Sequence, residues 1–192
     1  LMLNAMLAHI EQLGISIATL DIEIEARMAQ DVEFVEALDE ITGVGKISAQ
    51  TIIAEIGTDM SRFPTAENLA SWACMCPGNN ESAGKKKSGK TKKANSTLKK
   101  TLIQCGRGAA NSKGTYLNAL YHRIATRRGS KRATVAVGHA ILIICYHMIK
   151  NKSHYNELGV DYFKERNKDV LVRQSVKRLS ALGFEVSLKE IA

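Results

Sequence analysis

Lysine and hydroxyl side chains are concentrated in residues 77–101, where eight lysines and six serine or threonine residues occur within 25 positions. Pro77 and the glycines at 78, 84 and 89 interrupt regular structure, so most of this stretch is predicted to be loop. Cations and hydroxyls on a loop suit a polyanionic ligand, and a solvated charge run is the alternative. The lysines are Lys85, Lys86, Lys87, Lys90, Lys92, Lys93, Lys99 and Lys100.

The charge of the chain is divided by position. Residues 1–81 carry a net charge of −10, and residues 157–192 carry +1. Between them lies a basic segment, residues 82–156, which contains 17 lysines and arginines and no carboxylate. A segment of this kind predicts a cationic surface with nucleic acid as its partner. A membrane surface is less favoured, because the charge lies largely in a loop and not on an amphipathic helix face.

Composition favours an all-α fold. The 192 residues are 45% apolar, only 5% aromatic, and include two prolines. The longest apolar run, residues 135–149, is interrupted by Gly138, His139 and His147, and it is too short to span a bilayer. We therefore expect a core helix there, with both histidines as core residues and not as ligands. No membrane association is expected.

The four cysteines do not predict a disulfide framework in a chain of this length. Cys74-Met75-Cys76 lacks the Cys-x-x-Cys spacing of zinc hooks, so buried thiols are expected and no metal site. No signal peptide is recognisable, and we expect a reducing cytoplasm. The cysteines are Cys74, Cys76, Cys105 and Cys145.

Residues 1–38 are predicted to form one long helix with a coiled-coil seam, because apolar residues recur at alternating steps of three and four. The phase of this pattern slips at Met28, where Val32 and Val35 continue on a shifted face. Association of chains through the seam is expected, and an amphipathic helix packed on its own domain is the alternative. Since the chain starts within the helical pattern, we expect it to be a fragment. The seam is Leu3, Met6, Ile10, Leu13, Ile17, Leu20 and Ile24.

Residues 32–56 resemble a helix-hairpin-helix motif, in which a glycine turn joins two short helices. Here the turn is Gly43-Val44-Gly45-Lys46, and glycines would allow a phosphate to approach the backbone at the start of the second helix. A plain helical hairpin with capping glycines is the alternative. A second basic cluster between helices is also expected to bind nucleic acid, and it consists of Arg127, Arg128, Lys131 and Arg132.

These patterns predict three parts of the chain. Residues 1–38 form the coiled-coil helix, residues 39–165 form a compact helical domain with the basic loop, and residues 166–192 form a C-terminal helix and tail. Within the tail, the alternation of residues 184–188 predicts one short strand or an extended segment.

The stretch Pro77-Gly-Asn-Asn-Glu-Ser-Ala-Gly-Lys-Lys-Lys-Ser-Gly-Lys-Thr-Lys-Lys resembles the C-terminal transposase domain of the Piv-like insertion-sequence transposases. Residues 113–117, 139–148 and 157–163 resemble further parts of that domain, so the similarity extends from about Leu38 to the end. The resemblance implies a DNA recombinase with a RuvC-like domain, which binds Mg²⁺ and is absent from these residues. It also implies guidance by a structured RNA.

By position, the resemblance assigns the catalytic nucleophile to Ser82, in Glu81-Ser82-Ala83-Gly84, with Ser88 as the nearest competitor. Phosphodiester attack by a serine needs activation and charge neutralisation, which Mg²⁺ in the RuvC-like domain and the adjacent lysines would supply. Two positions depart from the pattern, because family members often have glycine in place of Cys74 and Ala94. No cofactor is expected within the chain itself.

Three functions remain open from the sequence. The first is the strand-exchange domain of a transposase that cuts and rejoins DNA through a phosphoserine intermediate. The second is a non-catalytic module that binds DNA or RNA through the helix-hairpin-helix and the lysines. The third is a coiled-coil assembly module whose basic face is incidental.

Overall fold

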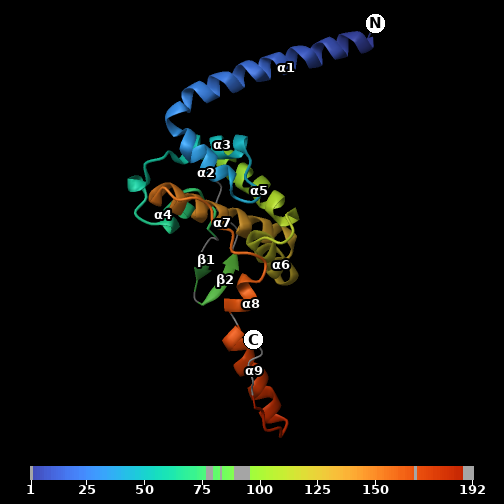
Figure 1. The fold of residues 1–192 in the computed structure, drawn as a ribbon, viewed down its shortest axis with the longest axis vertical. Helices are drawn as coiled ribbons and strands as arrows, with labels where there is room; N and C mark the ends of the chain where they lie inside the picture. Colours follow the sequence, from blue (N-terminus) through green and yellow to red (C-terminus); the bar gives the residue numbers. More distant parts are fainter. Residues whose placement is uncertain (1, 77–79, 83, 89–95, 167, 188–192) are drawn as a thin grey trace.

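The computed structural model describes residues 2–76, 80–82, 84–88, 96–166 and 168–187. A compact helical body lies between an N-terminal helix and a C-terminal helix, which leave it at opposite ends (Figure 1). The fold is all-α, as predicted, apart from one short pair of strands.

The N-terminal region is divided where the apolar pattern slips. Helix α1 (Met2–Arg27) projects from the body, and none of its residues is buried. A 3-10 turn, η1 (Ala29–Asp31), then precedes α2 (Val32–Asp39). The single helix predicted for residues 1–38 is thus interrupted, because Met28 leaves helical geometry with φ −95° and ψ 10°. This break lets α2 turn its Val35 and Leu38 into the core while α1 remains outside.

Two helices after α2 build one side of the body. Helix α3 (Lys46–Ile56) packs against α2 and buries Ala49, Ile52, Ile53 and Ile56. After the 3-10 turn η2 (Met60–Arg62) comes α4 (Ala66–Trp72). Thr65 caps it, since its side-chain oxygen accepts a hydrogen bond from Asn68 N at 3.3 Å.

The lysine-rich stretch contains an antiparallel β-hairpin, formed by β1 (Asn80–Ser82) and β2 (Lys85–Ser88). Loop was predicted for most of this stretch, so these strands are a correction. Gly84 has φ +75°, a left-handed conformation that suits the tight turn of a hairpin and that glycine adopts without strain.

The centre of the body is α7 (Ser130–Asn151), which packs on α5 (Ser96–Asn111) and α6 (Tyr116–Arg128) and also contacts α2 and α4. It contains ten buried residues, which confirms the core helix predicted over 135–149. Glycines let α5 and α7 meet closely: an added Cβ at Gly138 would lie 2.7 Å from Leu102 O.

Although α7 is long and apolar enough to cross a membrane, its burial identifies it as a core helix, and one such helix is weak evidence for a span.

The chain ends with α8 (Tyr162–Arg166) and α9 (Lys168–Ala181), and α9 extends away from the body (Figure 1). Residues 184–187 form neither strand nor helix, which corrects the short C-terminal strand considered for 184–188; residue 188 lies outside the described residues. A lone strand is unstable without a partner, and no described strand lies beside this tail.

Candidate nucleic-acid interface

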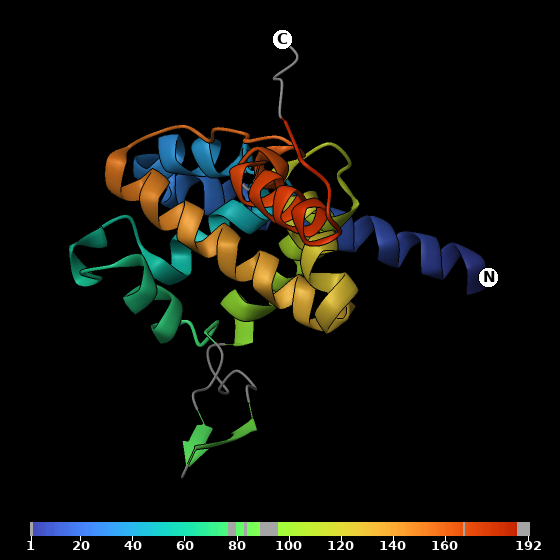
Figure 2. The same ribbon diagram turned by 90° about the horizontal axis from the view of Figure 1, so that it is seen from below.

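The hairpin that carries Ser82 projects from the body between the end of α4 and the start of α5 (Figure 2). In the register of the two strands Ser82 pairs with Lys85, and Glu81 pairs with Lys86. The backbone therefore places the predicted nucleophile at the turn end of the hairpin, opposite the first of the lysines. Lys90, Lys92 and Lys93, and Ala94, lie outside the described residues.

Residues 73–76, which follow α4 on the way to the hairpin and which we call the foot of the hairpin, begin with the C-cap of α4. Cys74 adopts a left-handed φ of +50° after α4, with Cys74 N bonded to Ser71 O at 3.0 Å and Met75 N bonded to Ala70 O at 3.0 Å. This pattern is a Schellman motif, whose left-handed position favours glycine. A glycine in place of Cys74 would adopt this backbone conformation without strain.

Cys76 joins the foot of the hairpin to the core helix, because its Sγ lies 3.9 Å from His139 Nε2 on α7. Burial lowers the pKa of His139 and raises the pKa of the Cys76 thiol, so the neutral forms of both are favoured. As predicted, His139 is part of the packing of the body. His147 was also expected to be a core residue, but that prediction is wrong, because His147 is exposed on α7. Cys74 and Cys76 are half-buried, and Cys105 and Cys145 are buried free thiols. Among the described residues no group of three His, Cys, Asp or Glu side chains could hold a metal.

The second basic cluster forms the corner between α6 and α7, with Gly129 at the bend. Arg127 and Arg128 occupy the last turn of α6, where the helix dipole favours cations, and both are exposed. Lys131 and Arg132 occupy the first turn of α7, where the dipole disfavours cations. No carboxylate offsets them, since none of the four is in an ion pair within the described part of the chain. An anion at this corner would gain from both the basic side chains and the helix N–H groups.

Helix α7 relates the two basic regions to each other. His139, beside the foot of the hairpin, is eight residues from Lys131, which corresponds to about 12 Å along a helix axis. Lys99 and Lys100 lie in the first turns of α5, directly after the hairpin. One helix thus connects the foot of the hairpin and the α6–α7 corner, although the two are far apart in the sequence.

The predicted helix-hairpin-helix turn has a different environment. Gly43 packs against α5, where an added Cβ would clash with Ala109 N and lie 2.5 Å from Cys105 O, and Val44 is only 5% exposed. Gly45 is exposed and precedes α3, with no atom within 4 Å of an added Cβ. The hairpin of helices is present, but packing on α5 accounts for Gly43 without a phosphate.

Lys46 of the same turn is engaged with acidic residues. Its Nζ lies 2.5 Å from Glu25 Oε1 of α1. This hydrogen bond, with the nearby charges of Glu25, Asp21 and Asp39, raises the pKa of Lys46. Because both partners are well exposed, the pair contributes little to stability, and a phosphate would have to compete with these carboxylates.

Glu157, the first carboxylate after the basic segment, has a structural role that the sequence pattern did not reveal. Its Oε1 accepts hydrogen bonds from Tyr116 N at 2.7 Å and Gly159 N at 3.0 Å. Its Oε2 accepts from Tyr155 OH at 3.0 Å and Thr42 Oγ1 at 3.2 Å. The carboxylate thus caps α6 and links it to the turn before Gly43.

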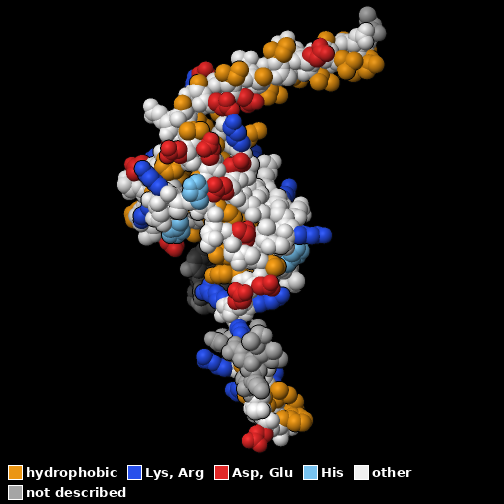
Figure 3. All heavy atoms as spheres, viewed as in Figure 1, with side chains coloured by type: hydrophobic (Ala, Val, Ile, Leu, Met, Phe, Trp, Pro, Cys, Tyr) orange, Lys and Arg blue, Asp and Glu red, His pale blue; other side chains and the backbone are white. Residues whose placement is uncertain are grey.

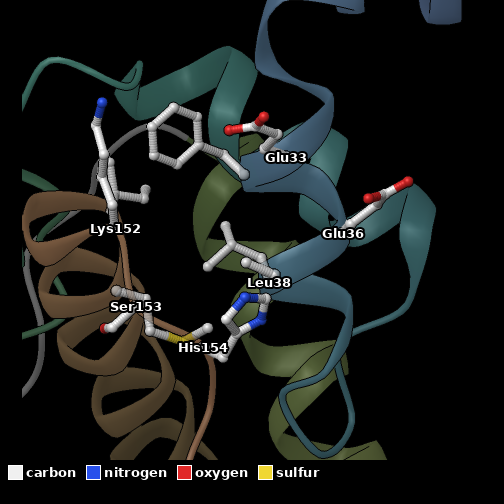
Figure 4. Close-up of a pocket in the computed structure, with 10 residues that line it drawn as sticks. Glu33, Glu36, Leu38, Lys152, Ser153 and His154 are labelled. Atoms are coloured by element: carbon white, nitrogen blue, oxygen red, sulfur yellow. The ribbon is translucent and has the colours of Figure 1, made fainter.

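A second carboxylate, Glu40, contacts the stretch that contains Glu157, residues 154–159, which we call the C-terminal segment. Glu40 lies 2.8 Å from His154 Nδ1 and accepts a hydrogen bond of 3.1 Å from Tyr155 N. Near it is a cavity of about 200 Å³ between α2 and the end of α7, and the residues that line it include Glu33, Leu38, Lys152 and His154 (Figure 4). This cavity lies at the opposite end of α7 from Lys131, and acidic side chains gather over α2 and the adjoining part of α1 (Figure 3).

The fold is a helical domain whose strand β2 and α6–α7 corner both belong to the basic segment, which contains no carboxylate. Residues 35–122, from α2 through most of α6, match the family model described as Transposase IS116/IS110/IS902 family. This match supports an insertion-sequence transposase domain, with DNA binding and transposase activity as the general role of the family. No curated protein matches the chain.

Proposed function

We propose that this chain is the DNA-binding and strand-exchange part of an insertion-sequence transposase, with Ser82 as its nucleophile. The observation that carries the proposal is the position of Ser82 at the turn of a lysine-bearing hairpin inside the segment that matches the transposase family. The hairpin, the start of α5 and the α6–α7 corner would hold the phosphates on either side of the reacting one.

In the proposed reaction Ser82 Oγ attacks a DNA phosphorus, and its proton passes to water or to a base of the completed site. A bond between Oγ and phosphorus forms while one phosphorus–oxygen bond of the DNA backbone breaks, leaving a free sugar hydroxyl. The lysines would offset charge on the transition state. Mg²⁺ in a RuvC-like domain would lower the pKa of the hydroxyl and orient the phosphate. Reversal with a second sugar hydroxyl rejoins the strand, because the phosphoserine ester conserves the bond energy.

The test is denaturing gel electrophoresis of labelled DNA with a protein that also contains the RuvC-like domain, supplied with Mg²⁺ and guide RNA. Ser82→Ala should abolish a covalent protein–DNA adduct while leaving DNA affinity nearly unchanged, since one neutral hydroxyl contributes little beside many lysines. Ser88→Ala is the matched control and should reduce the adduct modestly at most. An adduct that disappears only with Ser88→Ala would assign the nucleophile to Ser88. An adduct that survives both changes would reject the serine mechanism.

The second candidate function is a non-catalytic module that binds DNA or a structured RNA through phosphates alone. The cations at the α6–α7 corner, which have no ion-pair partner among the described residues, favour it equally, because phosphate binding does not depend on the chemistry at Ser82. Affinity without any adduct in the complete protein would favour this function. A cytoplasmic location is consistent with both proposals.

We further propose that α1 assembles chains into a homo-oligomer. Its seam residues are exposed along the whole helix, from Leu3 at 68% to Ile24 at 40%, and hydrophobic side chains follow α1 in Figure 3. A row of this length spaced at three and four residues is the pattern that coiled coils bury.

A further inference from the structure

Trp72, the single tryptophan of the chain, is the last residue of α4 and is 47% exposed. The other exposed large apolar side chains in the described part are mostly aliphatic. They lie on α1, at the start of α2 (Val32), at the start of α3 (Ile47) or toward the C-terminus. An exposed indole at a helix end offers a flat surface on which an aromatic ligand can stack.

The indole is held in place from one side. Its ring packs on Phe63, with centroids 5.5 Å apart and planes inclined by 57°. Phe63 is 8% exposed, and its carbonyl accepts a hydrogen bond of 2.9 Å from the buried Tyr146 hydroxyl of α7. Trp72 therefore rests on a support that is anchored to the core helix, while about half of its surface remains open.

The position of Trp72 connects it to the basic segment. The Schellman turn follows it directly, and Met75 then packs beside Gly138 of α7 at the foot of the hairpin. The end of α4 lies on one side of that foot and the start of α5, with Lys99 and Lys100, lies on the other (Figure 2). A nucleic acid whose phosphates contact the basic segment would bring its bases close to this aromatic surface.

We infer that Trp72 is a stacking platform for an unpaired base of the nucleic acid that the basic segment binds. This inference rests on the proposed function for the phosphate contacts and adds the class of ligand, a single-stranded or flipped-out nucleotide. Bases inside a duplex are already stacked, whereas an unpaired base gains affinity from a neighbouring aromatic ring, largely regardless of which base it is.

Because the chain has one tryptophan, its tryptophan fluorescence reports on Trp72 alone. We would titrate the chain with oligothymidylate, with an abasic strand of equal length, and with duplex DNA, while the fluorescence anisotropy of the labelled nucleic acid measures binding independently. Oligothymidylate should quench the tryptophan emission, and the abasic strand should bind with little quenching. Trp72→Ala should weaken oligothymidylate binding about tenfold and leave duplex affinity and the salt dependence unchanged, and Trp72→Phe should retain most of the affinity.

The anisotropy separates this inference from the proposed function. Binding of both strands with equal quenching, or with none, would overturn the stacking role while nucleic-acid binding stands. Absence of binding to any of the three ligands would overturn both. The wild-type titration does not depend on the folding of a variant, and thermal unfolding of Trp72→Phe checks that the Phe63 contact is retained.

Discussion

Glu157 Oε1 accepts a hydrogen bond of 2.7 Å from Tyr116 N, so a carboxylate of the C-terminal segment caps the first turn of α6. The two residues are 41 positions apart in the sequence. The same carboxylate also bonds Thr42, beside the turn whose Gly43 packs on α5. One side chain thus connects the C-terminal segment, the start of α6 and the α2–α3 turn within the domain.

Replacing Glu157 with Gln should destabilise the fold by about 1–2 kcal/mol at neutral pH, because charged acceptors make the stronger hydrogen bonds. Burial by itself raises the pKa of Glu157, but hydrogen bonds from Tyr116, Gly159, Tyr155 and Thr42 together lower it below its ordinary value of 4.5. A lowered folded pKa contributes stability that is present above the unfolded pKa and disappears as pH falls through the folded one. The difference between wild type and variant should therefore shrink below about pH 4.5.

Denaturant unfolding at neutral pH and at a pH below the ordinary glutamate pKa would measure this difference. Glu165→Gln, which makes the same charge change on an exposed residue of α8, is the control. A deficit of Glu157→Gln that stays constant with pH would contradict the role of the ionised carboxylate.

Gly43→Ala should destabilise the fold by about 3 kcal/mol or more. The new Cβ would clash with Ala109 N and meet Cys105 O at 2.5 Å, and the φ of +85° is unfavourable for alanine. Gly45→Ala is the matched control with open space at Cβ and an extended φ of −109°, and it should cost less than about 1 kcal/mol. Thermal unfolding compares the two, and equal destabilisation would contradict the packing role of Gly43.

Cys74→Gly should stabilise the fold by about 0.5–1 kcal/mol. Glycine removes the strain of the left-handed backbone, and this gain exceeds the extra conformational entropy that glycine loses on folding. Cys74→Ala removes the thiol while keeping the left-handed position, so its stability should stay close to wild type. Chemical denaturation would distinguish the variants. An equal gain in both would attribute the effect to the thiol and not to the backbone.

The hairpin and the α6–α7 corner should both contribute to the salt dependence of DNA binding. Lys131→Ala combined with Arg132→Ala should flatten the log–log salt slope by about 0.9 for each duplex phosphate that is no longer neutralised. Stability should not fall, since these cations oppose the dipole of α7. Changing Lys85, Lys86 and Lys87 to alanine should flatten the slope in the same way.

Fluorescence anisotropy at several salt concentrations gives these slopes. Lys152→Asn is the control, because it removes a cation at the far end of α7 and asparagine tolerates the left-handed φ of +49° there. Slopes unchanged in the triple and double variants would place DNA elsewhere on the protein.

Polar replacement of Ile10 and Ile17 should lower the mass of the chain in solution, if α1 associates through its seam. Ile15 and Ile22 are a matched control pair. They are similarly exposed but lie about 140° around the helix axis from Ile10 and Ile17, so their replacement should leave the mass unchanged. Light scattering measures both. A native chain that is monomeric at high concentration would contradict the coiled coil.

The sequence alone determined those features that depend on neighbours along the chain. Apolar periodicity predicted α7 and the body of α1, and the slip at Met28 coincides with the break before α2. The absence of carboxylates over residues 82–156 is likewise visible in the sequence. Helix geometry and local charge are set within a few residues, so a single sequence is enough to predict them.

Only the tertiary structure decided which residues meet. Gly43 was interpreted as a phosphate-binding glycine, but its contact with Ala109 depends on how the α2–α3 turn and α5 pack. The cap of α6 by Glu157 and the contact of Cys76 with His139 join positions 41 and 63 residues apart. Spacing along a chain does not specify such partners, because they depend on the angles at which whole helices pack. The same packing connects the foot of the hairpin to the α6–α7 corner through one helix.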